Sequence, residues 1–253
     1  MTYCLAMRLD EGLLLLSDTR TNAGVDNVST YRKLHVFSPD EDRVITLQSA
    51  GNLATTQEVL DRIRSDLAGS GESLATVKEL FGAALYVGRI AVEVAERHAA
   101  PLQRVGADGT ATFILGGQIE DGEPDILLVY PEGNYIRASD DRPFLQIGET
   151  KYGKAWLDLA VRSDADLRTS AKVALSSMTA TALANLSVGP PYDLGLLRRD
   201  AFDLQYLRIE GDSPYLDRLS GVWREHALAA VDALPEVEPG DIEIMSSDWV
   251  GPT

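Results

Sequence analysis

Apolar and polar residues in the first twenty positions predict two β-strands joined by a tight turn. A strand-like segment at 2–8 is followed by turn-forming residues at 10–12 and by a second apolar segment at 13–18. Turn residues between two such segments are typical of a β-hairpin. Pairing about the turn places Thr2 beside residues 18 to 20.

A second hairpin is predicted with strands at 33–37 and 44–51 and a turn at 38–41. Its pairing sets Lys33 opposite the stretch near Gln48. Both hairpins have polar residues at their open ends. If the hairpins lie side by side, one edge of a sheet collects Thr2, Asp18, Lys33 and Gly51.

Helical periodicity follows the hairpins. Thr55 and Glu58 have the spacing of a capping box at the start of a helix after Ala54. Apolar spacing predicts further helices at 73–97, 152–161, 166–186 and 215–234, and strands return at 111–115, 126–130 and 206–209. Strand pairs, two helices, strands and two helices suit an α+β fold with two sheets stacked between helical layers.

Length and composition predict one sizeable domain, 1–253, with a C-terminal helical extension from about residue 212. Of the 253 residues, 45% are hydrophobic, which is enough for a full core. The single cysteine, Cys4, excludes an internal disulfide and fits a reducing compartment. The early apolar run 13–16 is too short to span a bilayer and follows no basic segment. We expect a cytoplasmic protein with no membrane partner.

The formal net charge of −16 argues against a nucleic-acid partner, because such proteins need clustered lysine and arginine to neutralise phosphates. Two interpretations of the acidity stay open. It serves solubility, or it lets an acidic chamber attract basic peptides.

Thr2 is the residue with the most distinctive chemistry. Removal of Met1 would place a hydroxyl and a free α-amine on one residue. An α-amine titrates near ~7.7–8, so part of it is neutral at pH 7 and is able to take the hydroxyl proton. Thr2, Cys4 and Ala6 share one strand face and are small, which predicts room for a substrate.

A recognisable family pattern runs through these residues: Thr2, then Ser17-Asp18-Thr19-Arg20, then Lys33, then Ala50-Gly51. It resembles the proteasome β-subunit group of N-terminal nucleophile hydrolases. The strings SDTRTNAGVDNVSTYRK, AGNLATTQEV and NLSVGPPYDL are similar to the Anbu family, the bacterial proteasome homologues called the ancestral β-subunit, and the resemblance covers nearly the whole chain.

This resemblance implies a four-layer αββα sandwich that assembles as a ring-like or open helical homo-oligomer and needs no cofactor. It implies Thr2 as nucleophile, Asp18 and Lys33 as its charged partners, and the Gly51 N–H as oxyanion donor. The further residues implied are Ser187 in the catalytic network, Arg20 as structural support for the Asp18 turn, and Thr21, Ser49 and Leu53 in the specificity pocket.

Two positions depart from the family pattern. Glu149 stands where a serine follows the glycine, and Ala184 stands where an aspartate precedes Ser187 by three residues. The polar network at the α-amine is either rebuilt, with Glu149 or Asn185, or absent. Three functions therefore stay open: a threonine peptidase acting through an acyl-enzyme on Thr2, a scaffold or peptide-binding assembly with little proteolysis, and a small-molecule amidase.

Other reactive residues fit ordinary structural roles better. His35, His98 and His226 lack metal-ligand spacing, so we expect no metal site. Cys4 reads as a small buried strand residue rather than a thiol nucleophile. Lys33 by itself would also fit a charge at a strand edge. The apolar faces of the helices at 73–97 and 215–234 exceed what two sheets would cover, which predicts a homo-oligomer.

Overall fold

The computed structural model describes residues 1–22 and 28–237. Part of the motif that resembles the Anbu family, 23–27, and the end of the expected extension, 238–253, lie outside the described residues. The chain divides into two compact units, the first Met1–Ser213 and the second beginning at Pro214. We describe each unit by itself. The second contains helix α5 (Pro214–Asp232).

Two five-stranded antiparallel sheets form the first unit. One has the strand order β10-β1-β2-β11-β12 and the other β5-β6-β7-β8-β9. The first sheet consists of β1 (Tyr3–Leu9), β2 (Gly12–Asp18), β10 (Phe144–Gly148), β11 (Tyr192–Arg198) and β12 (Leu204–Ile209). The second consists of β5 (Leu34–Phe37), β6 (Arg43–Gly51), β7 (Ala111–Ile119), β8 (Asp125–Val129) and β9 (Tyr135–Arg137). A separate two-stranded ribbon pairs β3 (Arg20–Asn22) with β4 (Val28–Thr30).

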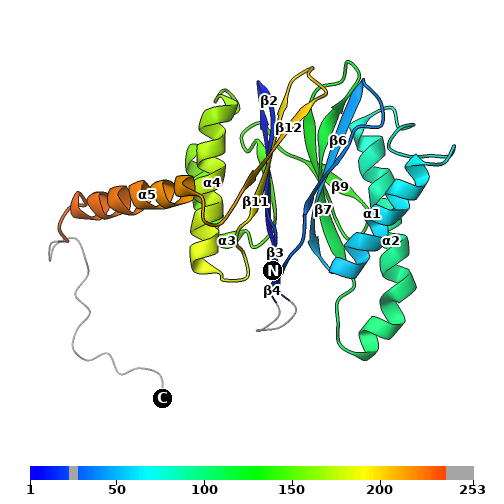
Figure 1. Ribbon diagram of the computed structural model, residues 1–253, viewed down its shortest axis with the longest axis horizontal. Coiled ribbons are helices and arrows are strands. Elements are labelled where there is room, and N and C mark those ends of the chain that lie inside the picture. The colour runs from blue at the N-terminus through cyan, green and yellow to red at the C-terminus, as the bar shows by residue number, and fades with distance from the viewer. Residues whose placement is uncertain (23–27, 238–253) are drawn as a thin grey trace. The chain divides into compact units, whose positions relative to one another are not determined.

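Helices cover the outer faces of both sheets. The four are α1 (Leu53–Leu67), α2 (Leu80–Arg104), α3 (Lys151–Ala160) and α4 (Leu167–Ala184). Helix α1 packs on β6 and β7, α2 packs on β7 and β8, α4 packs on β1 and β2, and α3 packs on α4. Figure 1 shows the resulting layers, with α1 and α2 outside one sheet and α3 and α4 outside the other. The expected four-layer αββα sandwich is confirmed.

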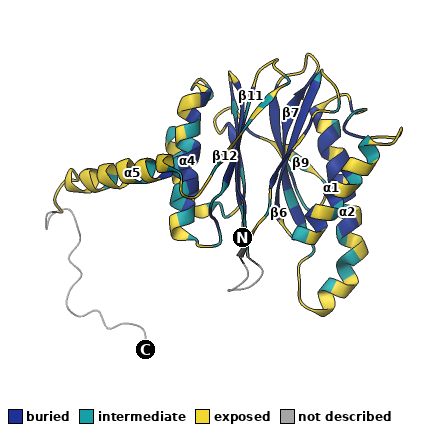
Figure 2. Ribbon diagram, in the orientation of Figure 1, coloured by how far each residue is buried: buried dark blue, intermediate teal, exposed yellow. Residues whose placement is uncertain are grey.

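Two apolar layers hold this sandwich together, and the buried faces in Figure 2 follow them. The layer between the sheets includes Leu13, Leu15 and Ile126. The layer between the second sheet and its helices includes Val87 and Phe113. All seven residues of β2 are buried because the strand is covered on both faces, by the other sheet and by α4. Removal of this apolar surface from water is the main stabilising contribution.

The registers of both hairpins match the sequence closely. Cys4 pairs with Ser17, which sets Thr2 beside residue 19 as predicted. Leu34 pairs with Gln48, so Lys33 lies one position beyond Gln48, where its carbonyl accepts from the Ser49 N–H at 3.2 Å.

The expectation that the hairpins share one sheet is wrong. The first hairpin lies in one sheet and the second in the other. Cys4 and Ala6 pack with Leu34, Val44 and other apolar residues between the sheets. Stacking face to face buries the apolar face of each hairpin, which a side-by-side arrangement would leave to be covered by other elements. The small residues Cys4 and Ala6 therefore fill a core position and leave no substrate space there.

Two helix starts differ from the prediction. Helix α1 begins at Leu53 because Asn52 is its N-cap and accepts from the Thr55 N–H at 3.2 Å, so the predicted capping box of Thr55 and Glu58 does not form. Helix α2 begins at Leu80 instead of 73. In the preceding segment the Thr76 hydroxyl oxygen accepts from the Ser73 N–H, which satisfies backbone groups outside a helix.

Candidate active site

Thr2 lies where β1 begins, at an open end of the two stacked sheets, and the chain's N-terminus is marked there in Figure 1. A cavity of about 510 Å³ opens at this point. Six residues selected from the sequence line it: Thr2, Thr21, Lys33, Ser49, Gly51 and Leu53. These residues therefore meet between the ends of two sheets. The prediction that they meet at the edge of a single sheet is wrong.

Asp18 and Lys33 form a buried ion pair beside this cavity. The Lys33 ammonium donates to Asp18 Oδ1 at 2.6 Å, and the Asp18 side chain is fully buried. Asp18 also accepts from the backbone N–H groups of Tyr3 at 3.0 Å and Gly189 at 3.4 Å. Burial raises the pKa of Asp18, while the Lys33 ammonium and the two N–H groups lower it. Because every neighbour is a donor, the arrangement suits an ionised carboxylate.

Lys33 is held from two sides. Its ammonium also donates to the Arg20 carbonyl at 2.7 Å, and the residue is only 5% exposed. A solvated charge at a strand edge would be largely exposed, so this alternative is excluded. The pair links the two sheets, since Asp18 ends β2 and Lys33 precedes β5.

Two glycines shape the cavity because no side chain fits at either position. Gly51 ends β6 with φ +112°, and a Cβ there would lie 2.6 Å from the Thr110 carbonyl oxygen. Gly148 ends β10 with φ +84°, and a Cβ there would lie 2.0 Å from the Thr2 carbonyl oxygen. Both values of φ are in the region that favours glycine. Backbone N–H groups can therefore approach a substrate at this end of the sheets.

Ser187 lies on the loop that follows α4, and Arg20 lies on β3. Neither residue lines the cavity. The Arg20 guanidinium donates to the Leu186 carbonyl at 2.8 Å and lies against Gly189. Since the Gly189 N–H donates to Asp18, contacts of the 186–189 segment connect Arg20 with Asp18.

A second polar chain borders Thr2. The Glu149 N–H donates to the Thr2 carbonyl at 2.7 Å. Asn185 donates from Nδ2 to Glu149 Oε2 at 3.0 Å, and its Oδ1 accepts from the Ser187 N–H at 3.0 Å. Glu149 departs from the family pattern, and Asn185 directly follows the other departure, Ala184. A hydrogen bond joins Glu149 and Asn185.

The weaker candidates have structural roles. Cys4 is buried, burial raises the pKa of its thiol, and its Sγ donates to the Ser49 carbonyl. Burial, with the charges of Arg64 and Arg32, lowers the pKa of His35 to about 4, so that histidine is neutral at pH 7. Among residues 1–22 and 28–237, no group of three or more His, Cys, Asp or Glu side chains is placed to hold a metal ion. No helix in these same ranges is long and apolar enough to cross a membrane.

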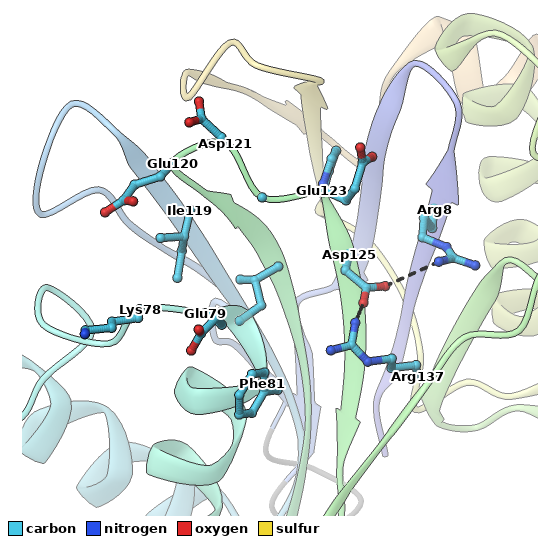
Figure 3. Close-up of a pocket in the computed structure, with 13 residues that line it drawn as sticks. Arg8, Lys78, Glu79, Phe81, Ile119, Glu120, Asp121, Glu123, Asp125 and Arg137 are labelled. Carbon is cyan, nitrogen blue, oxygen red and sulfur yellow. Dashed lines mark hydrogen bonds and ion pairs between the residues drawn. The ribbon is translucent and has the colours of Figure 1, made fainter.

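Another cavity, of about 530 Å³, lies at the opposite end of β1, next to Arg8. Figure 3 shows Asp125 there between the guanidinium groups of Arg8 and Arg137. Asp125 also accepts from the Ile126 N–H, so its charge is neutralised and its oxygens are used. None of the site residues predicted from the sequence lines this cavity.

Two residues that line the Thr2 cavity, Tyr31 and Thr56, were not predicted from the sequence, whereas Gly148 is the glycine that precedes Glu149 in the family pattern. Tyr31 stands two positions before Lys33, and alternation along an extended segment would have placed both side chains on one side. The family pattern identifies Gly148, but no local pattern shows its positive φ, which accompanies the approach of Thr2, a residue distant in the chain.

The chain is similar to solved structures over nearly its whole length. Residues 2–190 match the proteasome subunit family. An Anbu (Gly-1) mutant from Hyphomicrobium sp. strain MC1 is 41% identical with a TM-score of 0.87, over 94% of this chain and 100% of that chain. Anbu from Yersinia bercovieri is 40% identical with a TM-score of 0.87, over 94% and 99% of the two chains.

A third structure, described as the helical assembly of the Anbu complex from Pseudomonas aeruginosa, is 38% identical with a TM-score of 0.90, again over 94% of this chain and 99% of that chain. A comparison of the sequence with curated proteins finds no match.

Proposed function

This chain belongs to the proteasome subunit family, in its Anbu branch, and we propose that it is an N-terminal threonine hydrolase that cleaves amide bonds of peptides. The observation that most supports this proposal is the cavity at Thr2. It contains the Thr2 hydroxyl, a buried and ion-paired Lys33, and the strand-end Gly51. The three supply a nucleophile, a fixed positive charge and a backbone donor.

The proposed reaction begins after Met1 is removed, because the Thr2 nitrogen is otherwise an amide and is no base. Met1 is 63% exposed, so an aminopeptidase has access to it. The Thr2 amine takes the hydroxyl proton while Oγ attacks the substrate carbonyl carbon. The ammonium then gives that proton to the leaving nitrogen as the C–N bond breaks. Water hydrolyses the acyl-enzyme by the same steps.

Within this proposal each residue has one task. The Lys33 charge lowers the pKa of the Thr2 amine by like-charge repulsion, and Asp18 fixes Lys33 in place. The Gly51 N–H donates to the oxyanion, and Thr21, Ser49 and Leu53 line the space for the substrate side chain. Ser187 acts through the loop that it shares with Gly189, since it does not line the cavity.

A peptide epoxyketone tests the nucleophile directly. On protein whose intact mass shows that Met1 is absent, the reagent will add to both the hydroxyl and the amine of Thr2, and peptide mapping will locate one adduct there. A Thr2→Ala variant serves as the control and forms none. Absence of an adduct on processed parent protein would exclude Thr2 as the nucleophile.

We further propose that the subunits form a ring-like or open helical homo-oligomer in the cytoplasm, with the Thr2 cavities enclosed. The Anbu structure from Pseudomonas aeruginosa is described as a helical assembly. Apolar residues stay exposed on both units of this chain, among them Phe81 and Leu85 on α2 and Val222 and Leu228 on α5. Burial of such residues between subunits would stabilise an assembly.

Sedimentation velocity at micromolar concentration tests the assembly. We expect a particle many times heavier than the 27.5 kDa chain. A Leu85→Glu variant, which places a charge on the exposed face of α2, should shift the protein toward smaller species. A single species near 27.5 kDa in the parent protein would contradict the enclosed-cavity proposal.

The alternative function is a scaffold or peptide-binding assembly with little proteolysis. It is favoured by the Ala184 side chain, which supplies no carboxylate before Ser187, and by the position of Ser187 outside the cavity lining. The two functions differ in turnover. Stoichiometric adduct formation without multiple-turnover hydrolysis of any peptide in a library would favour the scaffold.

A further inference from the structure

We infer that the carboxylate of Glu149, held in place by Asn185, stabilises the protonated α-amine of Thr2 and so replaces the acid that the family pattern has before Ser187. The inference rests on the proposed function, since that amine exists only after Met1 is removed. Glu149 is a positioning residue in this scheme: it holds a charge and accepts no proton.

The backbone places Glu149 directly beside Thr2. Strand β1 pairs with β10 in a register that sets Tyr3 opposite Gly148. The next pair in this register is Thr2 and Glu149, and the Glu149 N–H donates to the Thr2 carbonyl at 2.7 Å. Directly opposed residues of an antiparallel pair have Cβ atoms about 4.5–5.5 Å apart. A carboxylate on one is therefore within electrostatic range of an amine on the other.

Asn185 fixes the Glu149 side chain at this place. Its Nδ2 donates to Glu149 Oε2 at 3.0 Å, while its Oδ1 accepts from the Ser187 N–H at 3.0 Å. Both ends of the amide are used, so its orientation is set. The same Nδ2 lies 4.0 Å from Met1 Sδ. Met1 is bonded to the Thr2 nitrogen. Before its removal, Met1 therefore already contacts the Asn185 amide that holds the Glu149 carboxylate.

The charges around the Thr2 amine come from several elements. Asp18 on β2 is paired with Lys33, which precedes β5. Arg20 on β3 donates to the Leu186 carbonyl, and the phenol of Tyr31 lies in the same cavity. Glu149 forms no ion pair with any residue in 1–22 or 28–237, so its negative charge is not cancelled by a cation there. It is the carboxylate available to the amine.

The positive charge of Lys33 and the negative charge of Glu149 together set the pKa of the Thr2 amine. Lys33 disfavours the ammonium form, whereas Glu149 favours it. When the hydroxyl proton moves to the amine, the ammonium that forms is stabilised by Glu149 until the proton passes to the leaving nitrogen. The carboxylate therefore makes the amine a stronger base.

Glu149→Gln tests this role because it removes the charge and keeps an oxygen for Asn185. On protein whose mass shows Met1 removed, the pKa of the Thr2 amine is measured by competitive acetylation over a range of pH with peptide mass spectrometry. We expect the pKa to fall by on the order of one pH unit. Acetylation of Thr2 at pH 7 would then rise ~5-fold, because more amine is neutral. Asn185→Ala should change the pKa in the same direction.

Glu132→Gln is the matched control. Glu132 is an exposed residue between β8 and β9, and its replacement changes the net charge equally without touching this network. An unchanged amine pKa in Glu149→Gln, or an equal fall in Glu132→Gln, would overturn the inference. The measurement needs no turnover. If the amine pKa differs between the parent protein and Glu149→Gln as expected, but the parent protein hydrolyses no peptide, the inference is supported and the proposed hydrolysis is refuted.

Discussion

A Lys33→Met variant will hydrolyse substrate slower by on the order of 10²–10⁴-fold and will lose about 3–5 kcal/mol of unfolding free energy. The loss of rate follows from removal of the charge beside Thr2. The loss of stability follows because Asp18, whose side chain is fully buried, then has no cation to pair with. Turnover of a fluorogenic peptide and urea denaturation measure the two effects.

Two control variants separate these effects. In Asp18→Asn/Lys33→Met both charges are absent, so most of the stability should return while hydrolysis stays lost. Lys154→Met removes a lysine that pairs with Asp158 on the surface of α3, and it should change stability by less than about 1 kcal/mol. If Lys33→Met keeps the parent rate, Lys33 has only a structural role.

Gly148→Ala is expected to lower the unfolding free energy by about 2–5 kcal/mol, the sum of backbone strain at positive φ and of overpacking. A Cβ at Gly148 would lie 2.0 Å from the Thr2 carbonyl oxygen, and that oxygen is held by the Glu149 N–H. Because the obstacle is backbone, no side-chain rotation relieves it. Displacement of Thr2 by about 1 Å should also slow hydrolysis by about 10²-fold.

Gly106→Ala provides the matched comparison. Gly106 also has a positive φ, +66°, but a Cβ added there would meet no atom within 4 Å. Only the backbone strain applies at this position, so we expect a cost of about 1–2 kcal/mol and an unchanged rate. Equal effects of the two substitutions on rate and stability would show that the contact with Thr2 is unimportant.

The sequence predicts most of the local structure because hairpins and helices depend on nearby residues. The turn at 10–12 specifies the β1–β2 register, which places Thr2 beside residue 19. The strand predicted at 44–51, after the turn at 38–41, likewise matches the bounds of β6 to within one residue. The four layers follow from the order of these elements and from the family resemblance together.

The parts of the site that escaped prediction depend on contacts between distant segments. Nothing near Lys33 in the sequence shows that its charge is buried, because that burial comes from Asp18 in the other sheet. The positive φ of Gly148 likewise reflects the approach of Thr2. The link from Asn185 to Glu149 joins the ends of α4 and β10, which no local pattern relates.

The division of the site between two sheets has a consequence for the order in which the protein gains its reactivity. Thr2 and Asp18 belong to the hairpin of one sheet, and Lys33 and Gly51 belong to the hairpin of the other. A nascent chain in which only one hairpin has formed contains only two of these four residues in place. Under the proposed function, the site is therefore complete only when the two sheets have docked, and Thr2 also needs the removal of Met1 before it can react. An unfinished chain is then an inactive precursor, because hydrolysis requires both the docked sheets and the free Thr2 amine.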